Sequence, residues 1–191
     1  MNVWSTRTIW TSIVALVVLI LQLCSVNVMM AAVPACKIPG HVVMEAQNLL
    51  RDLGALFPVH CLPYNINATF PRAAIANSTQ CHQALRALHY SLQAAEQVFE
   101  DYDVPLGEGG LAWDHRKLDD FQNLQNRLLH KDGCLPATAA TPDLGFTAYV
   151  GNVSTLLQQQ DSATCGWSML RRDVLWALKT ALRRHRSCFS W

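Results

Sequence analysis

Apolar residues recur at helical spacing along most of the chain after residue 40, in segments separated by stretches rich in Pro, Gly, Asn and Thr. No segment shows the sustained period-two alternation of apolar and polar residues that is typical of a half-buried strand. The pattern therefore predicts an all-α fold with five helices, whose approximate ranges are 40–56, 77–99, 111–131, 144–159 and 167–184.

The first three predicted helices each carry an apolar stripe, at steps of three and four residues in the first two and with one step of five in the third. The stripes are Val43, Ala46, Leu50 and Leu53 in the first helix, Cys81, Leu85, Leu88, Leu92, Ala95 and Phe99 in the second, and Trp113, Leu118, Phe121, Leu124 and Leu128 in the third. Asn77 or Ser78 is a suitable N-cap for the second helix, since either side chain can accept a hydrogen bond from the first turn.

The connections after the first and third helices, near 57–76 and 134–143, are long. An up-down bundle can be closed with short turns, whereas long connections allow helices to cross over before they pack. We therefore predict a five-helix bundle, up-up-down-down with long crossover connections, in one domain. The chain has no internal repeat, which argues against a helical solenoid.

The last predicted helix has two distinct faces when its residues are placed at about 100° intervals. The core face holds Trp167, Leu170, Val174, Ala177, Leu178 and Ala181, and the opposite face holds Arg172, Trp176, Lys179 and Arg183. Trp with Arg is the composition of interface hot spots. We interpret the second face as a recognition surface, with a chance surface tryptophan as the alternative.

The N-terminal segment has the order of a secretory signal: one basic residue, Arg7, then the apolar run 13–23, then small residues. We predict a signal peptide over 1–35, cleaved after Ala35, and a secreted single domain over 36–191. Cleavage after Ser25 is the competing choice. An uncleaved signal anchor over 13–34 is also considered, because that range approaches spanning length.

Six cysteines remain after this leader: Cys36, Cys61, Cys81, Cys134, Cys165 and Cys188. An even number in an oxidising compartment indicates bridges, although six cysteines allow 15 pairings. Cys81 lies on an apolar stripe, so we expect it to be a buried free thiol, with a bridge to Cys188 as the alternative. The three glycosylation candidates are Asn67, Asn77 and Asn152.

Motifs for catalysis or phosphate binding are missing from the sequence, and its seven histidines are scattered rather than arranged as converging zinc ligands. The chain is therefore not expected to be an enzyme or to need a metal or cofactor. Its net charge is only +1, which gives no indication of nucleic-acid binding.

Charge is nevertheless unevenly distributed. Eight of the 14 acidic residues lie within the 25 residues from 96 to 120, and six basic residues lie between 171 and 186 beside a single acid, Asp173. The alternatives are two solvated faces or surfaces that steer partners electrostatically.

Two motifs of the sequence are specific enough to compare with a known family. The segment 165–175, CGWSMLRRDVL, is similar to the Cys-x-Trp-x-x-(apolar)-Arg start of the last helix in type I interferons. Cys61-Leu62, followed eight residues later by Phe70-Pro71, is similar to the frame of the family's long first loop. The separation of 98 residues between Cys36 and Cys134 also fits.

The resemblance covers 36–191 and implies bridges Cys36–Cys134 and Cys61–Cys165. It implies a secreted antiviral cytokine that binds the heterodimeric type I interferon receptor, made of class II cytokine receptor chains, and triggers JAK/STAT signalling. Receptor contacts are implied at Leu62, Arg171, Arg172, Leu175, Trp176 and Lys179. No nucleic acid and no stable membrane insertion after signal cleavage are expected.

The first loop departs from the mammalian pattern, because Asn65 occupies the position where those members place an arginine hot spot. We therefore expect the last helix to carry more of the binding than the loop. Two other functions are considered: a helical cytokine with a different receptor, and a secreted membrane-active protein that uses its basic C-terminal helix.

Overall fold

The computed structural model describes residues 37–66, 68–107, 110–131 and 144–191. The predicted signal peptide, with both of its cleavage sites, therefore lies outside the described residues. Within the described ranges, no helix is both long enough and apolar enough to cross a membrane.

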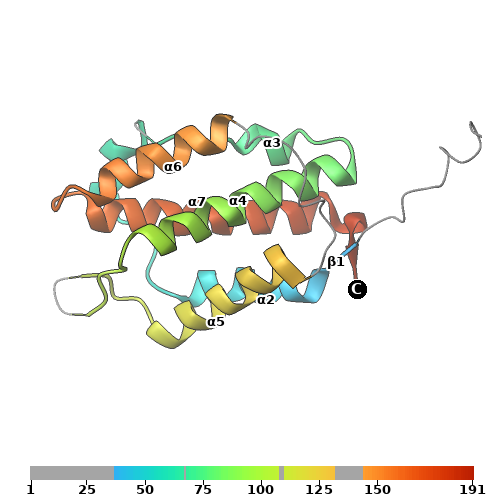
Figure 1. Ribbon diagram of the computed structural model, residues 1–191, viewed down its shortest axis with the longest axis horizontal. Coiled ribbons are helices and arrows are strands. Elements are labelled where there is room, and N and C mark those ends of the chain that lie inside the picture. Colours follow the sequence, from blue (N-terminus) through green and yellow to red (C-terminus); the bar gives the residue numbers. More distant parts are fainter. Residues whose placement is uncertain (1–36, 67, 108–109, 132–143) are drawn as a thin grey trace, which may run out of the picture. The chain divides into compact units, whose positions relative to one another are not determined.

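The fold is all-α, as predicted, with short additional elements between the main helices (Figure 1). The five long helices are α2 (Gly40–Asp52), α4 (Cys81–Asp101), α5 (His115–Asn126), α6 (Leu144–Leu157) and α7 (Ala163–Arg184). The short elements are β1 (Ile38–Pro39), the 3-10 helix η1 (Val59–Ile66), α3 (Arg72–Ala76), the π-helical turn η2 (Arg127–Lys131), the 3-10 turn η3 (Arg186–Cys188) and β2 (Phe189–Ser190).

Helices α2 and α4 run in one direction, and α5 and α7 run in the other, which is the predicted up-up-down-down order. The start of α4 is bonded to the residue just past the end of α7 through Cys81–Cys188. Likewise, β1 immediately precedes α2 and pairs with β2 beyond α7. The backbone N–H of Asp114, just before α5, donates to the carbonyl of Leu53, just past the end of α2, at 3.0 Å, so α5 starts where α2 ends. α6 packs against α4 and α7.

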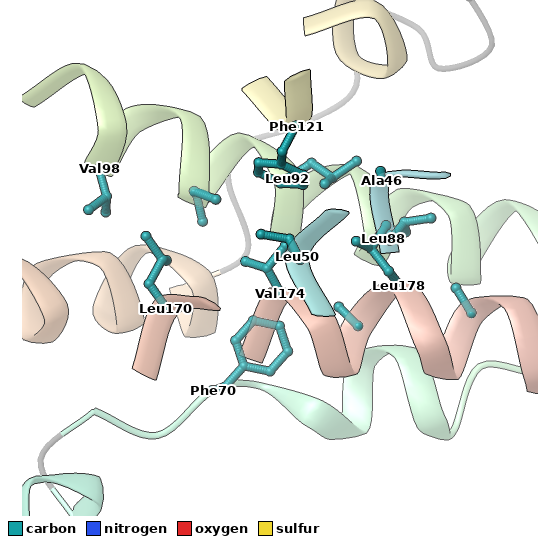
Figure 2. Packing of buried hydrophobic residues seen from close by; sticks show 14 of the residues in the cluster. Ala46, Leu50, Phe70, Leu88, Leu92, Val98, Phe121, Leu170, Val174 and Leu178 are labelled. Atoms are coloured by element: carbon teal, nitrogen blue, oxygen red, sulfur yellow. The ribbon is translucent and has the colours of Figure 1, made fainter. Parts of the chain in front are cut away.

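The core is formed by side chains from all five long helices. Leu50, Leu92, Phe121, Val174 and Leu178 belong to one buried cluster, shown in Figure 2. The whole predicted stripe of the first helix is at most 1% exposed. Most of the second and third stripes are buried too, so the helical periodicity identified the core correctly.

The start of α4 differs from the prediction. Residues 72–76 form the separate helix α3, and Asn77 is its C-terminal cap rather than an N-cap of α4. The Ser78 hydroxyl donates backward to the Ala74 carbonyl, which also ties it to α3. α4 therefore begins at Cys81, and the predicted cap at Asn77 or Ser78 is wrong.

The start of α5 also differs. The Asp114 side chain accepts a hydrogen bond from the backbone N–H of Lys117 at 3.1 Å, so the helix begins at His115 and not at Leu111. This is the geometry of an N-cap, which satisfies one of the unpaired N–H groups of the first turn. At the other end of the chain, α7 begins at Ala163, before the predicted start at Trp167.

The C-terminal tail was not predicted as an ordered element. Its strand β2 pairs in parallel with β1, with Ile38 opposite Phe189. Phe189 is buried, and a Cβ on Gly40 would lie 2.9 Å from a ring atom of Trp191, so Trp191 packs closely over the start of α2. The tail therefore joins the first and last helices at one end of the bundle.

Two disulfides are present among the described residues. Cys61–Cys165, which the family resemblance implied, is confirmed. Cys81–Cys188 is the second, so the expectation that Cys81 is a buried free thiol is wrong. Because Cys81 is the first residue of α4 and is exposed, its sulfur can reach Cys188 beyond α7. The predicted Cys36–Cys134 bridge lies outside the described residues.

Candidate functional site

The loop helix η1 and the residues just before it are fixed against the first half of α7 by three contacts. The Cys61–Cys165 disulfide joins the two elements covalently. Arg172 donates from Nη1 to the Asn65 side-chain oxygen at 2.6 Å, and its guanidinium lies 4.6 Å from the centre of the Phe57 ring. Asn65 therefore serves as an internal acceptor that positions the loop.

Several aliphatic side chains on and beside this loop face solvent. Leu62 is 52% exposed, and its neighbours Leu56, Val59 and Ile66 are 93%, 77% and 84% exposed. Val59 and Leu62 share a face, because residues three apart eclipse in a 3-10 helix. The sequence indicated only Leu62. The other three belong to no helical stripe: Leu56 is the last residue of the predicted first helix, and Val59 and Ile66 lie in the predicted loop, where an apolar residue gives no signal of its own exposure.

Arg172 is only 28% exposed and is bound to a fully buried carboxylate. Its Nε and Nη2 atoms donate to the two oxygens of Asp173 at 3.0 and 2.9 Å. Arg72 of α3 donates to the same carboxylate at 2.9 Å, and the Tyr149 hydroxyl donates from α6 at 3.3 Å. Asp173 therefore links α3 and α6 to α7.

The surroundings of Tyr149 favour its neutral form. Burial raises the pKa of the Tyr149 phenol well above its ordinary value, and the adjacent Asp173 carboxylate raises this pKa further. The phenol therefore keeps its proton and remains a hydrogen-bond donor to Asp173 at physiological pH. This network was not predicted from the sequence, since an Asp beside two arginines is typical of a charged surface.

Trp176 does not point freely into solvent, contrary to the helical-wheel prediction. Its ring makes an edge-to-face contact with Phe70 at 6.1 Å, and the Arg72 guanidinium lies 4.9 Å from the ring centre. The wheel placed Trp176 away from the α-helical core correctly, but the connection between α2 and α4 folds back over it. Trp176 is therefore half-buried beneath that connection.

The guanidinium of Arg171 is committed to the C-terminal end of α2. It donates to the carbonyls of Leu50 and Arg51 at 2.8 Å, of Gly54 at 2.7 Å and of Ala55 at 2.6 Å. Partial burial lowers the pKa of Arg171, although the side chain remains protonated. These four carbonyls occupy most of its donors, so the contacts assign Arg171 a structural role.

The remaining predicted contacts lie farther along α7. Lys179 is exposed, and Leu175 is half-buried against the core cluster. Leu62 and Lys179 are thus the predicted contact residues whose side chains are exposed and whose structural contacts are fewest.

Two further expectations concern modification and metal binding. Asn77 and Asn152 are exposed, as an occupied sequon requires, while Asn67 lies outside the described residues. Within the described part of the chain, His60, Cys61 and Cys165 are close enough to ligate one ion. The two sulfurs are joined in a disulfide, however, and a disulfide does not supply thiolate ligands.

The comparisons with known proteins agree with this architecture. No family model matches the chain. The chain is 26% identical over 151 residues to interferon alpha-F of Bos taurus, covering 73% of this chain and 77% of the relative. It is 24% identical over 176 residues to interferon tau of Cervus elaphus, covering 82% and 90%. The solved structure of zebrafish interferon 2 superposes with a TM-score of 0.60 at 27% identity, covering 78% of this chain and 99% of that one.

Together, the bundle and these similarities define a helical cytokine and not an enzyme. Within that class, the chain is type I interferon-like. The resemblance noted in the sequence at Cys61-Leu62 and at 165–175 is thus matched by similarity over most of the chain and by the fold.

Proposed function

We propose that this chain is a secreted antiviral cytokine that binds two class II cytokine receptor chains and thereby triggers JAK/STAT signalling. The observation that supports this proposal is its similarity to interferons in sequence and in the bundle fold. The proposal includes a signal peptide over residues 1–35 and a mature domain over 36–191.

We further propose that one receptor chain binds the surface formed by η1 and the outward side of α7. The exposed contacts are Leu62 and Lys179, with the half-buried Leu175 between the loop and the helix end. Arg172 and Trp176 support this surface, because they hold the loop and its continuation onto α7. The exposed Val59 and Ile66 extend it. Apolar side chains with a basic rim are a composition that suits a protein partner.

Arg172 and Trp176 are poor positions for testing this surface. Replacing either by alanine removes contacts to Asn65, Asp173 or Phe70, so lost binding and lost folding would be confounded. Leu62→Ser with Lys179→Glu avoids this problem, because both side chains are exposed. Leu144→Ser with Arg116→Glu is the matched control, since Leu144 is 85% exposed and Arg116 is exposed on α5.

The experiment measures antiviral protection of receptor-bearing cells and binding to the soluble receptor chains, with the melting temperature as a folding check. We expect the Leu62/Lys179 variant to bind one receptor chain at least tenfold more weakly, with an unchanged melting temperature. The control pair should bind that chain normally. Unchanged binding by the first pair would reject this surface, and lack of protection by the unmodified protein would reject the antiviral function.

A further inference from the structure

Helix α3 packs against α4 and α7, near the start of α4 and the end of α7 (Figure 1). The sequence at this end of the bundle is strongly basic. No Asp or Glu occurs between residues 53 and 95, a range that includes all of α3 and the first half of α4. None occurs from 174 to 191 either. The basic side chains of these two segments therefore have no Asp or Glu side chain from their own segment close to them.

The structure brings the two segments together around α3. Arg184 of α7 donates to the Ala76 carbonyl at 3.0 Å, and the His185 ring lies 2.9 Å from the Ile75 carbonyl. On the other side of α3, Arg86 and His82 of α4 line an open groove of about 390 Å³. The Cys81–Cys188 disulfide holds this end of α4 beside the end of α7.

The arginines at this end are exposed, and most have no anionic partner. In the described ranges, no carboxylate forms an ion pair with Arg86, Lys179, Arg183 or Arg186. Arg186 instead lies 4.5 Å from the centre of the Trp191 ring. Folding does not use these charges for ion pairs, and a run of unpaired guanidinium groups creates a positive potential that attracts anions.

We propose that this basic end, defined by Arg86, Lys179, Arg183, Arg184 and Arg186, binds a sulfated polysaccharide such as heparan sulfate. A polysaccharide chain presents closely spaced sulfates along its length, and guanidinium groups bind tetrahedral oxyanions with two parallel hydrogen bonds. The cations lie on both sides of α3 and not on one flat face, so an extended polyanion can contact several of them in turn.

An anionic membrane fits this surface less well. Binding at a bilayer surface needs an apolar face that enters the headgroup region. Of the four strongly exposed aliphatic side chains, Leu56, Val59 and Ile66 belong to the η1 loop and its flanks. Leu144 lies two residues before Phe146, which lines the same groove as Arg86, so it adds one apolar side chain there rather than an apolar face. Trp191 does lie there and is 57% exposed, but its ring stacks against the Arg186 guanidinium and its Nε1 donates to the Arg186 carbonyl at 3.2 Å, which fixes it in place.

The test uses the mature protein and immobilised heparan sulfate in 0.15 M salt. Arg86→Gln with Arg183→Gln is the informative variant, because neither side chain makes a hydrogen bond or ion pair to another described residue. Arg116→Gln with Arg127→Gln removes the same charge from exposed positions on α5 and η2. We expect the first pair to weaken binding about tenfold and the second to change it less than twofold.

Two further arms separate the sources of binding. Heparin stripped of its sulfates should not compete, and phosphatidylserine vesicles should bind more weakly than heparan sulfate. Arg86→Lys with Arg183→Lys keeps the charge but not the paired hydrogen bonds, so it should bind more tightly than the glutamine pair and more weakly than the unmodified protein. This comparison distinguishes lost charge from disturbed folding. Equal losses in the two glutamine pairs, no binding at 0.15 M salt, or preference for the vesicles would each overturn the proposal. Lys179 belongs to both proposed surfaces, but none of these variants changes it and none of these measurements involves the cytokine receptor, so the result is independent of the proposed receptor contact.

Discussion

Replacing Arg171 by alanine should destabilise the fold rather than weaken a receptor contact directly. The guanidinium satisfies the carbonyls of Leu50, Arg51, Gly54 and Ala55, where α2 ends and its own hydrogen bonds run out. A cation at a helix C-terminus is also favoured by the helix dipole. The side chain therefore closes the end of α2 and joins it to α7.

The size of this destabilisation depends on which of the four carbonyls can form a hydrogen bond to water once the guanidinium is removed. The bonds to Arg51 and Ala55 are exposed, so water replaces them at little cost, whereas those to Leu50 and Gly54 are partly buried. At about 1.5 kcal/mol for each partly buried bond to a charged donor, the loss is about 3 kcal/mol. For a chain of this size, that corresponds to a decrease in melting temperature of roughly 6–12 °C.

Thermal unfolding followed by circular dichroism measures this decrease, and amide hydrogen exchange locates it. Faster exchange should be concentrated in the last turn of α2 and in residues 53–56. Arg171→Lys should fall between the wild type and the alanine variant, because an ammonium keeps the charge but forms fewer bonds. Arg183→Ala is the matched control, with an expected change within about 0.5 kcal/mol. An unchanged melting temperature with receptor binding reduced tenfold would refute this reasoning and make Arg171 a direct receptor contact.

Three further predictions concern stability. Cys81→Ser with Cys188→Ser should lower the free energy of unfolding by roughly 4 kcal/mol, as measured by denaturant titration. With Cys61–Cys165 in place, the loop that Cys81–Cys188 closes in the unfolded chain is about 43 residues long. A loss below 1 kcal/mol would show that this bridge restricts the unfolded chain little. Asp173→Asn should lower the free energy of unfolding by about 2–4 kcal/mol, because it leaves the guanidinium groups of Arg72 and Arg172 without their carboxylate. The control variant Asp161→Asn, at an exposed position, should change this free energy very little. Equal free energies of unfolding for the two variants would argue against the network. Burial lowers the pKa of His89, and the nearby His130 lowers it further to a smaller extent. The unfolded chain therefore binds a proton at His89 more readily than the folded chain does. Stability should therefore fall as pH drops below about 6.5, and less so in His89→Gln, as measured by melting temperatures between pH 7 and 5.

The sequence predicted the helices well because their cores depend on local periodicity. Val43, Ala46 and Leu50 lie on one face wherever the rest of the chain goes, and all are buried. Helix boundaries were less accurate, because they depend on individual side chains. The bond from Lys117 to Asp114 sets the start of α5, and no periodicity encodes it.

The candidate site was harder to predict because it is built from distant segments. A helical wheel treats α7 alone, so it could not show that Phe70 and Arg72 fold over Trp176. The same limit applies to Asp173, whose partners come from other helices as well as from the next residue. Cys81 and Cys188 show it again, since their pairing depends on two helix ends meeting after the chain has folded.

Helix α7 is covalently anchored close to both of its ends. Cys165 lies in its first turn, and Cys188 follows its last turn by only a few residues. The helix therefore cannot be exchanged with that of a second molecule unless disulfides break, which guards against domain-swapped dimers. Its outward surface is also already ordered before any partner arrives. A partner that docks there has little conformational entropy to remove, so we expect encounter to be limited by diffusion and orientation rather than by folding.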